Sequence, residues 1–86
     1  MVNRRMKAQA ALSLARRAAR RNDLTVTELP GRGKGSHRMY AVLDLAGKEV
    51  ARFGLTHHSA DTSWTVLRQL ESQLAPLFGD RWMEKR

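Results

Sequence analysis

His37 is the residue of this sequence best placed to do chemistry, because it follows a glycine-rich basic loop in the run Gly35-Ser36-His37. An imidazole titrates near neutrality, so it can take a proton from a ribose 2′-hydroxyl or give one to a leaving oxygen. RNA supplies its own 2′-oxygen as nucleophile, so a base, an acid and nearby cations suffice without a metal. The alternative is that His37 is an ordinary solvated loop residue.

The loop before His37 alternates glycine with basic residues, which gives a backbone that can approach phosphates closely beside cations. It matches neither the P-loop nor the dinucleotide-binding pattern, because a strand and not a helix is predicted after it. It could also be a simple hairpin connection. We expect RNA or phosphate contacts from this loop and from arginines of the preceding helix: Arg32, Lys34, Gly35, Ser36, Arg38, Arg16, Arg17, Arg20 and Arg21.

The adjacent pair His57-His58 is a second candidate. Neighbouring strand residues point to opposite faces, so the two imidazoles are poor joint ligands, and no cysteine or carboxylate cluster accompanies them. We therefore expect no metal and no other cofactor. One of the two could be an acid, an orienting group or a phosphate contact, or could merely fill space at a strand end. Tyr40 and Arg52 are expected on an open sheet face, where they could meet RNA.

The chain has 86 residues, no cysteine and a net charge of +8. The surplus lies in the first 40 residues, which contain ten basic and two acidic side chains. Such clustering favours a polyanionic partner, nucleic acid or an anionic membrane surface. The length predicts one domain over residues 1–86. No apolar run is long enough to span a membrane and no secretory signal is evident, so we expect a soluble, cytoplasmic protein.

The elements that must position these residues follow from periodicity. Residues 6–22 are rich in alanine, leucine and arginine and predict a helix with one apolar and one arginine face. Residues 24–57 predict three strands with turns at Pro30-Gly31 and Ala46-Gly47. A second amphipathic helix is expected over 62–75, capped by Asp61 or Thr62 and ended or kinked by Pro76, before a short tail over 76–86.

This order predicts an α+β fold, α-β-β-β-α, with a three-stranded antiparallel sheet. Both helices can cover one sheet face, which leaves the other open. The parity of the third strand places Ala51, Phe53 and Leu55 toward the core. Trp82 in the tail either folds back onto the domain or stays loose.

The stretch from Gly33 to Tyr40, with its Gly-Ser-His run opening the second strand, resembles the HicA family of toxins. The resemblance covers about residues 24–75 and implies a double-stranded-RNA-binding-like fold. It also implies that His37 is the catalytic residue of an mRNA-cleaving toxin and that a HicB-like antitoxin covers the site. The chain departs from the family in lacking a proline before the second histidine, where Leu55-Thr56 stands, and in its longer, arginine-rich first helix.

Three functions therefore compete at this point. The first is a metal-independent endoribonuclease, the toxin of a toxin–antitoxin system. The second is an RNA-binding module of the same fold in which His37 is incidental. The third is a protein-interaction adaptor that uses the open sheet face and does not retain RNA at moderate salt.

Overall fold

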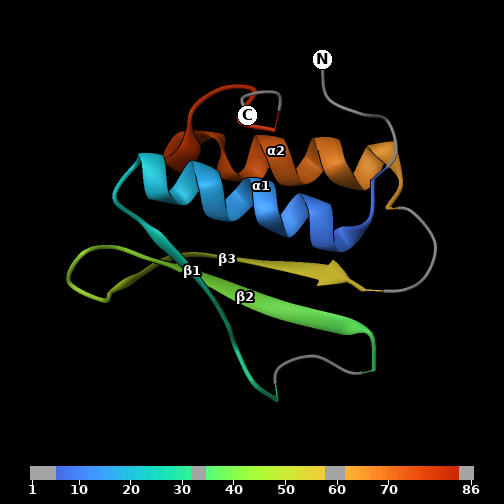
Figure 1. The fold of residues 1–86 in the computed structure, drawn as a ribbon, viewed down its shortest axis with the longest axis horizontal. Helices are drawn as coiled ribbons and strands as arrows, with labels where there is room; N and C mark the ends of the chain where they lie inside the picture. Colours follow the sequence, from blue (N-terminus) through green and yellow to red (C-terminus); the bar gives the residue numbers. More distant parts are fainter. Residues whose placement is uncertain (1–5, 32–34, 58–61, 84–86) are drawn as a thin grey trace.

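A computed structural model describes residues 6–31, 35–57 and 62–83 of the chain. It confirms the predicted α+β order α-β-β-β-α (Figure 1). The elements are α1 (Ala8–Arg21), β1 (Thr25–Glu28), β2 (His37–Leu43), β3 (Glu49–Thr56) and α2 (Trp64–Phe78). Neither helix is long and apolar enough, over the described residues, to cross a membrane.

The alanine-rich face of α1 lets this helix lie close to the rest of the domain. Ala11, Ala15, Ala18 and Ala19 are fully buried, and a side chain of one methyl group keeps the helix axis near its neighbours. The helix ends at Asn22, whose side-chain Nδ2 donates to the carbonyl of Ala18 at 2.8 Å. That bond satisfies one of the carbonyls that every helix leaves open at its end.

The second helix differs from the prediction at both ends. Its N-cap is Ser63, whose hydroxyl accepts from the backbone N–H of Val66, whereas Thr62 is buried and bonds the carbonyl of Met6 through its own N–H. Asp61 lies outside the described residues. The helix continues through Pro76 to Phe78 instead of ending at Ala75. Pro76 is exposed in the last turn, where water can solvate the carbonyl that loses its partner, so the proline is tolerated.

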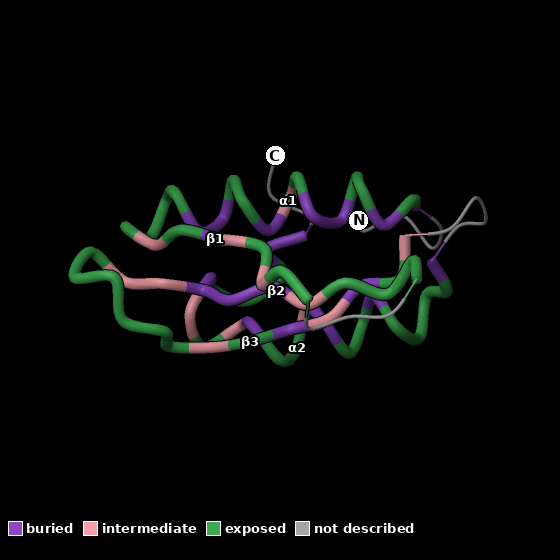
Figure 2. Tube along the Cα trace, turned by 90° about the horizontal axis from the view of Figure 1, so that it is seen from below, coloured by how far each residue is buried: buried purple, intermediate pink, exposed green. Residues whose placement is uncertain are grey.

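The sheet is antiparallel with the strand order β1-β2-β3. Alternate residues of each strand face the helices, and Val42, Phe53 and Leu55 on that side are buried, as predicted for the last two. Ala51 packs against the same core. Figure 2 looks from the sheet side and shows α1 beside β1 and α2 beside β3, so both helices lie on one face and the other face is open.

Tyr40 is the exception to the predicted parity. It was expected on the open face, but it is 1% exposed and lies on the helix side, paired with Phe53 across β2 and β3. The two rings stack with centroids 5.3 Å apart. Side chains alternate between the two faces along β2, and His37 lies on the open face. Tyr40, three residues later, therefore lies on the core face.

The segment from Gly79 to Met83, after α2, folds back and completes the core. Trp82 is fully buried, its indole N–H donates to the carbonyl of Glu71 at 2.9 Å, and its ring meets Phe78 edge-on at 5.1 Å. The backbone N–H of Met83 donates to a carboxylate oxygen of Glu71 at 3.1 Å. The short tail is therefore an integral part of the domain.

Replacing Trp82 with alanine should lower the free energy of unfolding by about 3–5 kcal/mol, because it leaves a large cavity in a small core. Urea denaturation followed by circular dichroism measures the loss. Trp64→Ala is the matched control: that residue is 40% exposed and its ring lies under the Arg68 guanidinium at the surface, so its loss should cost less than about 1 kcal/mol. Equal losses in the two variants would show that the tail does not stabilise the domain.

Candidate active site

His37 is the first residue of β2 and lies on the open face of the sheet. The chain reaches it through Gly35, whose φ of +58° lies in the left-handed region that glycine adopts without strain. Ser36 pairs with β3, since its carbonyl accepts from the N–H of His57 at 2.7 Å. The loop residues Gly35 and Ser36 thus fix the point at which the imidazole enters the sheet.

Two residues of β3 hold the His37 ring in place. Thr56 is its cross-strand partner, and the Thr56 hydroxyl lies 3.1 Å from Nδ1. The ring lies over Gly54, because a Cβ added there would come within 3.0 Å of both Cε1 and Nε2 of His37 and within 2.9 Å of the Met39 sulfur. Any larger residue at position 54 would have to displace the ring.

The exposed imidazole therefore has one nitrogen engaged and one available. Nε2 has no hydrogen-bond partner among the residues that the structure describes. When Nδ1–H donates to the Thr56 hydroxyl, Nε2 carries a lone pair and is a base; when the hydroxyl donates to Nδ1, Nε2–H is an acid. This arrangement can move a proton in either direction at the sheet surface.

Arg38 does not share the face of His37. As the next residue along β2 it points to the helix side, where its guanidinium lies 3.9 Å from the carboxylate of Glu28. Arg32 and Lys34 lie outside the described residues. On the open face the described cation is Arg52, expected there from strand parity, and the carboxylate of Glu49 holds it through both oxygens at 3.0 Å.

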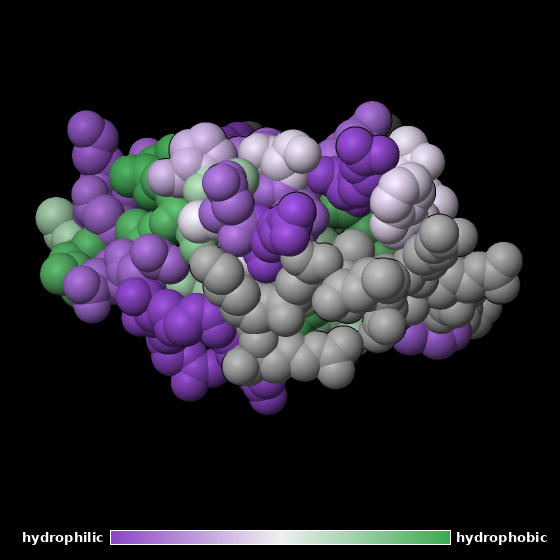
Figure 3. Space-filling model, turned by 90° about the horizontal axis from the view of Figure 1, so that it is seen from above, coloured by the Kyte–Doolittle hydropathy of each residue, from purple (hydrophilic) through white to green (hydrophobic). Residues whose placement is uncertain are grey.

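The arginines of α1 form a second surface, which we call the arginine stripe: Arg16, Arg17, Arg20 and Arg21. All are exposed, and none has an ion-pair partner within the described parts of the chain. Like charges one helical turn apart repel each other, so a bound polyanion would relieve the repulsion. Figure 3 looks onto the helix layer and shows hydrophilic side chains gathered there. Because α1 covers one face of the sheet and His37 lies on the other, the arginine stripe and His37 lie on different sides of the sheet.

A shallow groove runs between the arginine stripe and the nearest strand. Arg16 and Arg20 line one wall, and Leu24, Thr25 and Val26 line the other. β1 is an edge strand, so its outer side has no neighbouring strand with which to form hydrogen bonds. The groove therefore brings two arginines of α1 beside an edge strand of the sheet.

His57 lies on the helix side and is half-buried. The hydroxyl of Tyr40 lies 2.7 Å from its Nε2. Burial lowers the pKa of His57, the Arg38 guanidinium lowers it further, and Glu28 opposes them. A neutral His57 with its proton on Nδ1 can accept the Tyr40 O–H at Nε2, and the pair lies at the end of the core. Burial also raises the pKa of Tyr40, so this phenol stays protonated. His58 lies outside the described residues.

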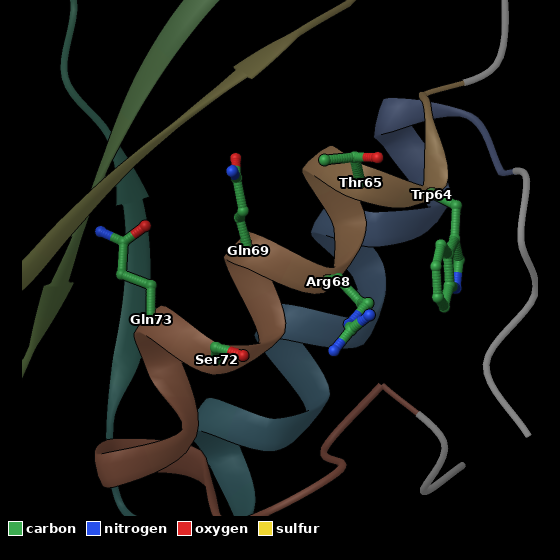
Figure 4. A pocket seen from close by; sticks show the side chains of 6 residues that line it. All are labelled: Trp64, Thr65, Arg68, Gln69, Ser72 and Gln73. Atoms are coloured by element: carbon green, nitrogen blue, oxygen red, sulfur yellow. The ribbon is translucent and has the colours of Figure 1, made fainter.

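A polar groove on α2 went unnoticed in the sequence because its residues have no chemical signature in common (Figure 4). It is lined by Trp64, Thr65, Arg68, Gln69, Ser72 and Gln73. The Arg68 guanidinium lies over the Trp64 ring at 5.0 Å, and Gln73 donates to the carbonyl of Arg52 at 2.8 Å. Arg68 is the ionisable residue of this lining, so the groove can bind a ligand but is poorly equipped for acid–base chemistry.

Metal ligation finds no support in the side chains that can be placed. The described ranges contain no group of three or more histidine, cysteine, aspartate or glutamate residues able to hold an ion. His37 and His57 face opposite sides of the sheet, so they do not converge on one point.

Protein stability should depend on pH through His57. The unfolded chain protonates this residue near its ordinary pKa of 6.5, whereas the folded protein resists protonation. Its contribution is therefore intact above that pKa and is lost as pH falls from 6.5 toward the lower folded value. Denaturation midpoints between pH 7.5 and 5 should show a steeper decline in the wild type than in His57→Gln. Tyr40→Phe keeps His57 and should instead lower stability at every pH. If stability declines with falling pH at the same rate in all three proteins, folding does not hold His57 in its neutral form.

Comparisons with protein-family models, with curated proteins and with solved structures find no match to this chain. The resemblance to HicA toxins therefore rests on the Gly35-Ser36-His37 run and on the order of the elements.

Proposed function

We propose that this protein is a metal-independent endoribonuclease of the HicA type that cleaves mRNA, with His37 as its catalytic residue. The observation that carries the proposal is an exposed imidazole held at Nδ1 by Thr56, with Nε2 available to solvent. The resemblance adds the biological setting: the toxin of a toxin–antitoxin system, acting in the cytoplasm, with a HicB-like antitoxin that covers His37.

The reaction that fits this geometry is an internal transphosphorylation of RNA. Nε2 of His37 takes the proton of a 2′-hydroxyl, the 2′-oxygen bonds to phosphorus, and the bond from phosphorus to the 5′-oxygen breaks. The 5′-oxygen leaves with a proton from imidazolium or water, so the products are a 2′,3′-cyclic phosphate and a 5′-hydroxyl. Proton transfer by one well-placed side chain accelerates a reaction about 100- to 10,000-fold.

The proposal predicts that His37→Ala lowers the rate of RNA cleavage by about 100- to 10,000-fold. Cleavage is measured on a labelled RNA in EDTA, with the 2′,3′-cyclic phosphate identified as the product terminus. Expression of the wild type should arrest growth and expression of the variant should not. Retention of RNA by the variant at the same salt concentration is the control, and undiminished cleavage by His37→Ala would end the assignment.

A second candidate is a non-catalytic RNA-binding module of the same fold. It is favoured by the arginine stripe, which lies away from His37 and needs no chemistry to bind a phosphate backbone. In this alternative His37 is incidental. The two candidates agree on RNA as the partner and differ only in whether a product forms.

Both candidates predict that the double variant Arg16→Gln/Arg20→Gln binds RNA more weakly and with a shallower salt dependence. Each lost contact to single-stranded RNA should reduce the slope of log affinity against log salt by about 0.7. Fluorescence anisotropy between low and moderate salt measures both quantities. Arg52→Gln is the control, because Glu49 already neutralises that guanidinium and its loss should change the slope less. Equal slopes in the double variant and the wild type would exclude the arginine stripe as an RNA surface.

A further inference from the structure

We propose that Thr56 is a positioning residue of the active site: its hydroxyl accepts Nδ1–H of His37 and thereby keeps the lone pair on Nε2, where RNA arrives. The inference rests on the proposed function and deepens it, since it names the group that sets the protonation pattern of the catalytic imidazole. It follows from the contact between His37 and Thr56 together with the seat provided by Gly54.

The register of β2 and β3 brings the two side chains together. His57 donates its backbone N–H to Ser36 directly opposite, so the next pair along, His37 and Thr56, is one in which the strands do not exchange hydrogen bonds. In antiparallel sheets these pairs bring side chains closest, with Cα atoms about 4.5 Å apart. A 3.1 Å contact between Nδ1 and the hydroxyl is the direct result.

The ring has little freedom to leave this contact. Threonine is stiff about χ1 because two heavy atoms branch from its Cβ, so the hydroxyl has a defined position. On the other side, the ring rests over Gly54 beside the Met39 sulfur. The imidazole is therefore engaged at Nδ1, and Cε1 and Nε2 occupy space that is open only because position 54 has no side chain.

The Thr56 hydroxyl affects which ring nitrogen of His37 carries the proton more than it affects the stability of the fold. Thr56 is exposed and lies on the open face, so it contributes nothing to the buried core. When its oxygen accepts Nδ1–H, that hydrogen bond is kept when Nε2 takes a proton, and the positive charge strengthens it. The ring can thus gain and lose the Nε2 proton during the reaction without reorienting.

The test compares the wild type with Thr56→Val, Thr56→Ser and Gly54→Ala. Valine keeps the branched shape without the hydroxyl, serine restores the hydroxyl, and alanine at position 54 pushes the ring while leaving Thr56 intact. The tautomer of His37 is read from imidazole ¹⁵N shifts in the RNA-free protein, and kcat and KM are measured with a labelled RNA. Thermal unfolding confirms that each variant is folded.

We expect Thr56→Val to lose the Nδ1–H tautomer and to lower kcat by about 10- to 100-fold with KM unchanged. Losses of this size follow when a residue that hydrogen-bonds and orients a metal-binding histidine is removed. Thr56→Ser should recover both, and Gly54→Ala should lower kcat while the hydrogen bond survives or lengthens. An unchanged tautomer or an unchanged kcat in Thr56→Val overturns the inference. If His37→Ala is inactive in that case, the proposed function survives; if His37→Ala also cleaves normally, both fail.

Discussion

The antiparallel register between β2 and β3 is the constraint on which the other features of this site depend. It sets His37 opposite Thr56, places Gly54 under the imidazole and pairs Tyr40 with Phe53 in the core. A slip of one residue would exchange the two faces of the strand and bury the imidazole. The buried aromatic pair opposes such a slip, because it would move the Tyr40 ring into water and away from Phe53. The core therefore enforces the geometry of the surface site.

The arginine stripe and His37 lie on different surfaces because of the way α1 packs. The alanine face of α1 packs inward, which leaves the arginines of the helix on the outside of the helix layer. His37 lies on the opposite side of the sheet, so the proposed ribonuclease would bind the RNA backbone on one surface and react with it on another. An RNA strand that meets both must pass around an edge of the domain. The edge at β1, where Arg16 and Arg20 line a groove, is the nearest to the arginine stripe.

The two histidines that the structure describes have opposite roles because they leave β2 and β3 on opposite faces. His37 is exposed over a glycine and keeps a nitrogen for a ligand, whereas His57 is drawn into the rim of the core by the Tyr40 hydroxyl. The same strand end thus carries one imidazole suited to proton transfer and one suited to closing the core. Burial makes the difference, since it disfavours the charged form of His57 and lowers its pKa.

The order of elements, the turns and His37 as the candidate imidazole follow from the sequence alone, because periodicity and glycine placement act locally. The residues around His37 do not: Thr56 and Gly54 lie 19 and 17 positions away and become its neighbours only through strand register. Arg38 follows His37 in the sequence, and the arginines of α1 belong to the same basic half of the chain. Strand alternation nevertheless turns Arg38 to the helix side. Helix packing places the arginine stripe away from the open face. Two local predictions were wrong: Tyr40 lies in the core instead of on the open face, and α2 continues past Pro76 to Phe78 instead of ending at Ala75. The sequence determines which residue types are present and which elements they form. The pairing of β2 with β3 and the packing of the helices determine which side chains meet.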